Sequence, residues 1–321
     1  MAMTELEKSI VRTIAYFDLL EYPLTSTEVW HWLYKPSQDS GQLPTILEIQ
    51  EVLESSPSLR KIIGREEAFY HLLGREQIVQ QRKRRNLIAD HKFIRARRIV
   101  KLFRLIPWVR MIAVCGSLAL SNTTKESDID LFIVTKSGRI WSTRLLLVGI
   151  LKILRLRPTE NNTTDKICLT YFVTTDALNL EQAQIASDDI VFTYYTETFL
   201  PLYDPNQTYA KFYQANSWYH KVLPNATWPN SCTIAVSNGR VVNVWHRFFN
   251  FFSPLLFNSQ TEEWFKRYQL KILPVRLKSI ANIDSRVIIS DNVLKFHDQD
   301  NRLEMLAKWL NKVNELLRQV A

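Results

Sequence analysis

The sequence predicts a mixed α/β protein, with a small mixed sheet at its centre and helical segments on either side. Between residues 110 and 174, apolar runs and a helical pattern follow the order strand, helix, strand, helix, strand, which is typical of a small α/β sheet. The first 75 residues and those after 206 instead carry apolar side chains at helical spacing. The 321 residues allow two or three units. We place an N-terminal domain at 1–75, the α/β core with a long basic leading helix at 76–205, and a C-terminal helical domain at 206–321.

Net charge, the spacing of the cysteines and the length of the apolar runs indicate the kind of partner and the compartment of the protein. The net charge of +9 suggests an anionic partner such as a nucleotide, a nucleic acid or an acidic lipid. Cys115, Cys168 and Cys232 lie far apart, which fits a reducing compartment better than a disulfide framework. The apolar runs are too short or too interrupted to reach the ~20 residues of a membrane span. We expect a soluble, cytoplasmic protein without stable membrane insertion, in which the aromatic residues at 245–252 pack between helices. The neighbouring Arg247 and Lys266 leave association with a membrane interface as the less favoured alternative.

The first 75 residues predict three helices followed by a hairpin. Apolar residues from Leu6 to Phe17 have helical spacing, and the capping boxes at 25–28 and 45–48 begin two further helices. The stretch "LRKIIGREEAFYHLLG" predicts two short strands around a charged turn. This order resembles a winged helix-turn-helix domain. The helix that would enter DNA repels phosphate, because it carries no Lys or Arg and has Glu48, Glu51 and Glu54. We therefore favour a structural or partner-binding role over DNA binding.

A long basic helix is predicted from about Glu76 to Leu105. Its apolar stripe runs from Ala89 to Phe103, and the remaining positions are rich in Lys and Arg. Most of these charges are expected to face solvent, whereas a few, for example Arg95 and Arg98, would meet phosphate. The sequence does not choose between them.

The stretch "CGSLALSNTTKESDIDLFIVT" joins two predicted strands and contains the candidate site. Asp128 and Asp130 begin the strand 128–135 and point to the same face, because side chains alternate along a strand. Two neighbouring carboxylates repel each other unless a cation lies between them, and Mg²⁺ prefers such oxygen ligands. Gly116 leaves room for a phosphate, and Ser117 adds a hydroxyl at the predicted start of a helix. These residues predict a site for a metal–triphosphate.

The same pattern resembles the DNA polymerase β-like nucleotidyltransferase superfamily, whose signature is an apolar strand, Gly-Ser, a spacer and Asp-x-Asp. The resemblance covers Met111–Val134, with weaker agreement over the next helix and strand. It implies that Asp128 and Asp130 bind Mg²⁺ or Mn²⁺, and that Gly116 and Ser117 lie against the phosphates of a nucleoside triphosphate. An acceptor hydroxyl would then attack the α-phosphate in line and expel pyrophosphate.

The third carboxylate of active family members has no clear counterpart. It usually lies on the next strand, here "KICLTYFVT", whose inward positions would be either Cys168, Thr170 and Phe172 or Ile167, Leu169 and Tyr171. Asp165, just before this strand, is the first candidate, and Asp189 and Glu197 on a later helix are alternatives. The loss of a catalytic base typically costs ~10² to 10⁴ in rate. In the spacer, where many relatives have a glycine, we expect Asn122 to adopt the left-handed conformation.

Three functional hypotheses follow. The first is a Mg²⁺-dependent nucleotidyltransferase, whose acceptor is a small molecule, a protein hydroxyl or an RNA end. The second is a catalytically degenerate sensor that binds nucleotide and signals through the N-terminal domain to a partner or DNA. The third is a DNA-binding regulator. The polar stretch 278–301 is expected to be an exposed loop, with residues 295–302 as an alternative lid over the site.

Overall fold

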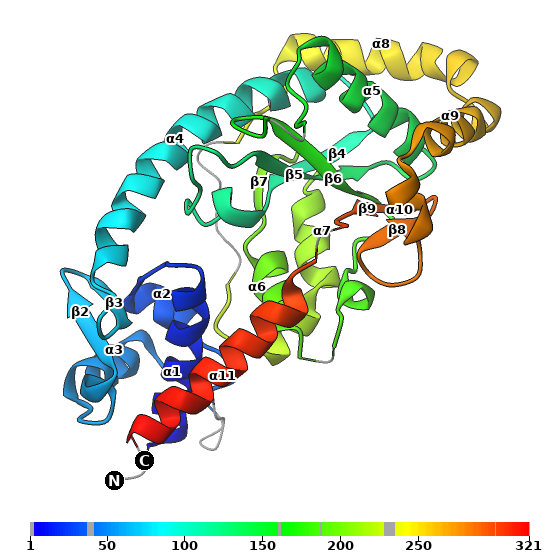
Figure 1. Ribbon diagram of the computed structural model, residues 1–321. Helices are drawn as coiled ribbons and strands as arrows, with labels where there is room; N and C mark the ends of the chain where they lie inside the picture. The colour runs from blue at the N-terminus through cyan, green and yellow to red at the C-terminus, as the bar shows by residue number, and fades with distance from the viewer. Residues whose placement is uncertain are drawn as a thin grey trace.

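The computed structural model describes residues 3–36, 42–159, 162–186, 188–227, 235–298 and 300–320, so Cys232 lies outside the described residues. Within these ranges the centre of the protein is a six-stranded mixed sheet in the order β7-β4-β5-β6-β9-β8 (Figure 1). Its strands are β4 (Val109–Val114), β5 (Ile129–Thr135), β6 (Ile167–Thr174), β7 (Leu200–Tyr203), β8 (Val287–Ile289) and β9 (Val293–Phe296). The predicted mixed α/β class is therefore confirmed for the centre of the chain.

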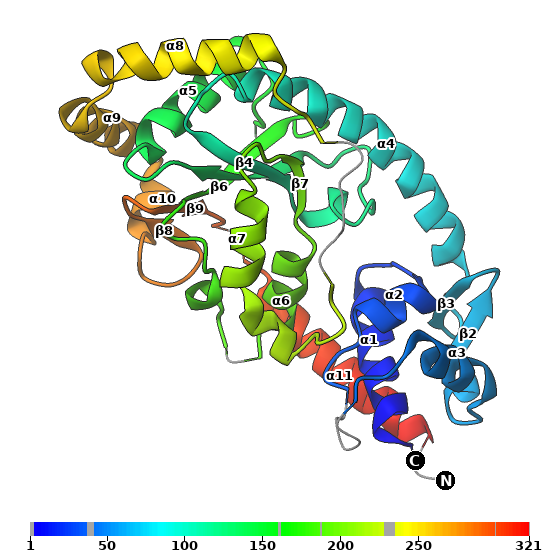
Figure 2. The same ribbon diagram turned by 180° about the vertical axis from the view of Figure 1, so that it is seen from behind.

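The central strand β5 pairs antiparallel with β4 and parallel with β6. It is buried on both faces, because helices cover the sheet from two sides. One face packs under α4 (Gln77–Phe103), α5 (Ile140–Ile153), α8 (Arg240–Leu256) and α9 (Ser259–Ile272), and the other packs against α6 (Ile190–Glu197) and α7 (Thr208–Ala215) (Figures 1 and 2). Alternate residues of β5 divide between two hydrophobic clusters, with Ile133 in one and Phe132 in the other.

The N-terminal residues form the predicted helices and hairpin. The helices are α1 (Glu5–Leu19), α2 (Ser26–His31) and α3 (Ile46–Ser55), and β1 (Leu24–Thr25), β2 (Ile63–Glu66) and β3 (Phe69–Leu72) make a small antiparallel sheet. The capping boxes of α2 and α3 are both formed. The winged-helix resemblance and the domain boundaries stay predictions.

The last helix, α11 (Arg302–Val320), crosses the molecule and lies beside α1 (Figures 1 and 2). The indole Nε1 of Trp309 donates a hydrogen bond to the carbonyl oxygen of Arg12 at 2.9 Å. One hydrophobic cluster includes side chains of α1, of α11 and of the sheet face that carries Phe132. The N-terminal elements therefore share this apolar cluster with the central sheet.

The prediction of an exposed loop at 278–301 was wrong, because β8 and β9 extend the sheet beside β6. These strands were missed since each is three or four residues long and lies among polar residues. The alternative of a flexible lid is contradicted too. Lys295 and Arg302 are buried, and Arg302 pairs with Asp189 at 2.8 Å.

The expected packing of the α8 aromatic residues holds for Phe249, which contacts Trp108 and Phe257, but it was wrong for Phe248 and Phe251. Phe248 and Phe251 are 57% and 78% exposed, rather than packed between helices. An amphipathic pattern gives the spacing of an apolar stripe but not the direction in which it points. Within the described ranges, the helices are all too short or too polar to cross a membrane.

Candidate functional site

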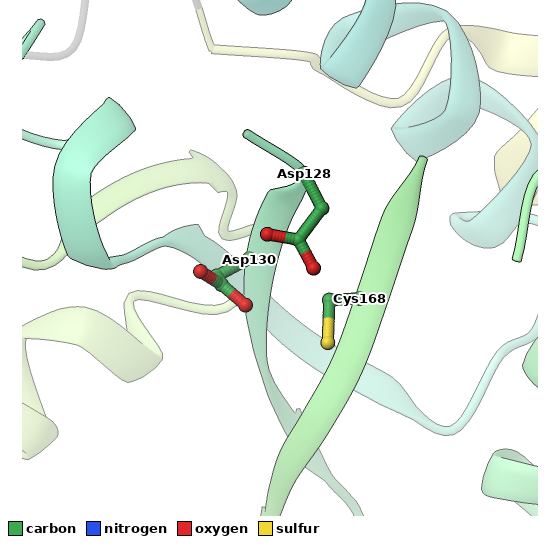
Figure 3. Close-up of side chains that lie close together, drawn as sticks. All are labelled: Asp128, Asp130 and Cys168. Carbon is green, nitrogen blue, oxygen red and sulfur yellow. The ribbon is translucent and has the colours of Figure 1, made fainter. Parts of the chain in front are cut away.

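Asp128 and Asp130 lie at the beginning of β5, beside Cys168 on the parallel strand β6 (Figure 3). Asp130 is paired in register with Cys168, and Asp128 lies one residue before the strand. A carboxylate oxygen of each aspartate and the Sγ of Cys168 lie within 4.8 Å of one another. The predicted pair is therefore formed, and Ile129 points to the opposite, buried side of the sheet.

A β-bulge in β6 decides which of its side chains join the aspartates. The register passes from Asp130–Cys168 to Phe132–Tyr171, so two residues of β6 oppose one residue of β5. Cys168 and Tyr171 consequently share the face of Asp130. Each of the two alternating sets predicted from the sequence is correct for one part of the strand, because the extra residue reverses the alternation.

The site favours a cation. Burial raises the pKa of both carboxyl groups, and the charge of Asp128 raises the pKa of Asp130 further. A hydrogen bond with the Cys168 thiol lowers the pKa of both carboxyls and opposes part of this effect. A bound cation would relieve the repulsion between two carboxylates held this close. Two carboxylates and a thiol are also a chemically suitable set of metal ligands.

Gly116 lies directly against Asp130. Its φ of +65° is in the left-handed region, and a Cβ atom at this position would lie 3.3 Å from Oδ2 of Asp130. The amide of Cys115 donates to the carbonyl oxygen of Asp130 at 3.1 Å and fixes the turn beside β5. Both the backbone conformation and the close approach of the carboxylate therefore favour glycine at this position.

The helix predicted after Gly116 is a single 3₁₀ turn, Gly116–Leu118. The expected α-helix N-terminus is therefore not formed, and anion binding here would depend on a few local amides and the exposed hydroxyl of Ser117. Ser121, rather than Asn122, adopts the left-handed conformation, with φ +53°. Asn122 instead donates from its side-chain amide to the carbonyl oxygen of Leu20 at 2.8 Å. It thus joins the spacer to the N-terminal elements.

Lys92 on α4 is a positioning residue that the sequence analysis did not single out. It is 2% exposed, and its Nζ lies 3.1 Å from a carboxylate oxygen of Asp165. It also donates to the carbonyl oxygens of Lys125, at 3.3 Å, and Ser127, and so holds the loop that leads into Asp128. The sequence could have indicated that Lys92 is buried, because position 92 falls on the same face of α4 as the apolar stripe.

The other carboxylates proposed for the third position lie elsewhere. Asp165 pairs with Lys92 and is not part of the cluster formed by Asp128, Asp130 and Cys168. Asp189 caps α6 by accepting from the amide of Phe192 at 3.0 Å, and it also pairs with Arg302. Glu197 accepts a hydrogen bond from Nε1 of Trp32 at 2.8 Å and contacts Nε2 of His31 at 2.9 Å.

Comparison with known proteins gives one match. Residues 95–178 match the family model of a nucleotidyltransferase domain. The matched segment begins within α4 and ends after β6, so it contains the turn at Gly116 and all three residues of the Asp–Asp–Cys cluster. No curated protein and no solved structure matches the chain.

Proposed function

We propose that the protein transfers a nucleoside monophosphate from a nucleoside triphosphate to an acceptor hydroxyl. The proposal starts from residues 95–178, which match a nucleotidyltransferase domain and carry the Gly-Ser and Asp-x-Asp motifs of the DNA polymerase β-like superfamily. The observation that carries this proposal is the position of Asp128 and Asp130. Both lie at the mouth of β5 inside the matched segment, and Asp130 lies directly against Gly116.

In this proposal Asp128 and Asp130 would hold a divalent ion, Mg²⁺ or Mn²⁺, and the phosphates of the nucleotide would bind the same ion. When bound, the ion neutralises charge on the attacking and leaving oxygens. Ser117 and the neighbouring amides orient the β- and γ-phosphates. The acceptor oxygen forms a bond to the α-phosphorus, and the α–β phosphoanhydride bond breaks. Pyrophosphate leaves with the electron pair of that bond, and the acceptor proton passes to solvent.

Cys168 replaces the third carboxylate in this scheme. Mg²⁺ is held by oxygen ligands, whereas a thiolate suits softer ions. A ligand set of two carboxylates and one thiol supports Mn²⁺ as the more effective ion, with Mg²⁺ bound through the two aspartates alone. The chain's own contribution is then mainly positioning and charge neutralisation rather than proton removal.

The acceptor is proposed to be a small molecule. A cavity of about 430 Å³ adjoins the segment that follows Gly116, with Ser121, Arg82, His31 and Glu197 among its lining residues. This volume falls within the range of small-molecule sites, roughly 300–1,000 Å³. DNA is a poorer fit, because the exposed side of α3 presents glutamates toward any approaching phosphate. A protein hydroxyl and an RNA end remain alternatives that the assay below distinguishes.

A nucleotide sensor is the second candidate function. It is favoured by one observation, since the described residues of the cluster offer Cys168 where active relatives carry a carboxylate. Such a protein would retain metal–nucleotide binding and transfer little or nothing.

The test is a transfer assay with each α-labelled nucleoside triphosphate, with Mg²⁺ or Mn²⁺, and with a cell extract as the source of acceptors. The wild type is compared with the double variant Asp128→Asn, Asp130→Asn and with the exposed control Asp176→Asn. The double variant removes like charges, so its melting temperature should not fall, and lost activity is then not lost folding.

Label that appears on a metabolite with the wild type and the control, but not with the double variant, supports the proposed transfer. Label on protein or RNA would replace the small-molecule acceptor. If no label is transferred while metal–nucleotide still raises the melting temperature of the wild type, the protein is a sensor. If neither occurs, both functions are excluded.

A further inference from the structure

Helix α8 turns an apolar stripe toward solvent along its whole length. The buried Val242 and Ser253 face the protein, and Phe249 packs edge-to-face on Trp108 with ring centroids 5.5 Å apart. The outward stripe follows helical spacing, with exposed fractions between 43% and 82%, and includes Val241, Val244, Phe248, Phe251, Phe252 and Leu255. A surface helix normally points such a stripe at the core.

The stripe continues into an apolar groove where α8 meets the ends of α4 and α5. The groove has a volume of about 440 Å³, and its walls include Leu102, Leu105, Ile153 and Trp245. Ile153 is 82% exposed at the end of α5. Together with the stripe, these side chains make a continuous apolar surface of the kind that marks an interaction site.

Positive charge surrounds this surface. The three segments that meet there, 95–114, 139–158 and 240–261, contain no Asp or Glu and carry six, five and two Lys or Arg residues. Lys152 and Arg155, on either side of Ile153, are exposed. The combination of an amphipathic helix, aromatic residues on its apolar face and flanking basic residues is typical of helices that lie in the plane of a membrane surface.

We propose that α8 and the adjoining groove dock the protein on the surface of an anionic lipid bilayer. The stripe enters the boundary between headgroups and acyl chains by about 5–10 Å. The exposed basic residues of these segments, such as Lys101, Lys152 and Arg155, lie among the acidic headgroups. The helix of 17 residues, about 25 Å long, lies flat rather than spanning. A second copy of the chain is a poorer occupant, because it would bring two basic surfaces together. This inference does not depend on the transfer reaction.

The test is flotation of the full-length protein with vesicles of phosphatidylcholine alone and of phosphatidylcholine mixed with phosphatidylglycerol. The wild type should float with the anionic vesicles and release at high salt. The double variant Phe248→Asn, Phe251→Asn should lose at least a hundredfold in affinity, about tenfold or more for each phenylalanine. The variant Lys152→Glu, Arg155→Glu should lose affinity for the anionic vesicles by at least about fivefold for each residue. The control Leu47→Asn, Leu87→Asn changes exposed leucines elsewhere and should bind as the wild type does.

Because all substituted side chains are exposed, circular dichroism and melting temperature should be unchanged in every variant. Absence of binding to both kinds of vesicle would overturn the proposal. Equal binding by the wild type and the phenylalanine variant would overturn the role of α8. Light scattering after gel filtration measures the oligomeric state of the wild type and of the phenylalanine variant. A wild-type dimer that the phenylalanine variant converts to a monomer, without any lipid binding, would assign the surface to a second copy.

Discussion

Replacing Cys168 by aspartate would place a third carboxylate beside the Asp128–Asp130 pair. The Sγ of Cys168 lies within 4.8 Å of an oxygen of each aspartate. At an effective dielectric constant of about 20, two unit charges at that distance repel each other by about 3 kcal/mol. Two such pairs would therefore lower the free energy of unfolding by several kcal/mol, or raise the pKa of one carboxyl until it is protonated.

A divalent ion reverses the sign of this effect. Three carboxylates around Mg²⁺ exchange mutual repulsion for attraction to the ion, so Mg²⁺ should raise the melting temperature of Cys168→Asp by more than that of the wild type. The new carboxylate also supplies the base that the wild type lacks, which is worth ~10² to 10⁴ in rate. We therefore expect Cys168→Asp to transfer faster with Mg²⁺, and the wild type to prefer Mn²⁺.

The assay combines thermal unfolding, with no metal, with Mg²⁺ and with Mn²⁺, and the labelled transfer reaction. Cys168→Ser is the matched control, because it keeps the size of the side chain but offers no thiolate. It should lose the preference for Mn²⁺ without gaining activity with Mg²⁺. The reasoning is refuted if Cys168→Asp unfolds at the same temperature with and without Mg²⁺, or if Cys168→Ser retains the metal preference of the wild type.

Two further predictions concern buried lysines. Lys92→Met should lower the free energy of unfolding by about 1–3 kcal/mol, because the carbonyl oxygen of Ser127 loses its donor, whereas the exposed Lys101→Met should change it by less than about 0.5 kcal/mol. Urea unfolding measures both, and equal losses would contradict the positioning role. Burial and the charge of neighbouring Arg302 lower the pKa of Lys295 from the usual 10.5 to about 8. Between about pH 8 and pH 10.5 the unfolded chain therefore binds more protons than the folded chain, so the stability of the wild type should rise with pH across this range. Lys295→Met should thus be more stable than the wild type by up to about 3 kcal/mol at pH 7, reduced by the loss of the hydrogen bond from Lys295 to the carbonyl oxygen of Ser285. This gain in stability should shrink by pH 10. A gain that does not change with pH would contradict the lowered pKa of Lys295.

The sequence predicted the centre of the molecule well, because its signals there are local. The basic helix at 76–105, the strand before Gly116 and the strand that begins at Asp128 were all found within a few residues of their true bounds. Each has a strong period or a clear boundary, and the Gly-Ser and Asp-x-Asp motifs fix their relation. The pair of aspartates beside Gly116 was predictable for the same reason.

The remaining features depend on contacts between distant segments. The bulge in β6 comes from pairing with β5, so no periodicity within 167–174 reveals that Cys168 and Tyr171 share a face. The strands at 287–296 exist because β6 offers them an edge. Asp165 was close in sequence to the right position, but Lys92, from a helix more than 70 residues earlier, pairs with it outside the cluster.

The contact between α11 and α1 has a consequence for how the chain folds as it is synthesised. Trp309 and its hydrogen-bond partner Arg12 are separated by 297 residues. At typical rates of synthesis, the face of α1 that receives α11 waits roughly 15–60 s for its partner. Closing so long a loop is entropically costly, and such non-local contacts form slowly. The N-terminal elements are thus made first yet completed last, and during that interval a chaperone has apolar surface of α1 to bind.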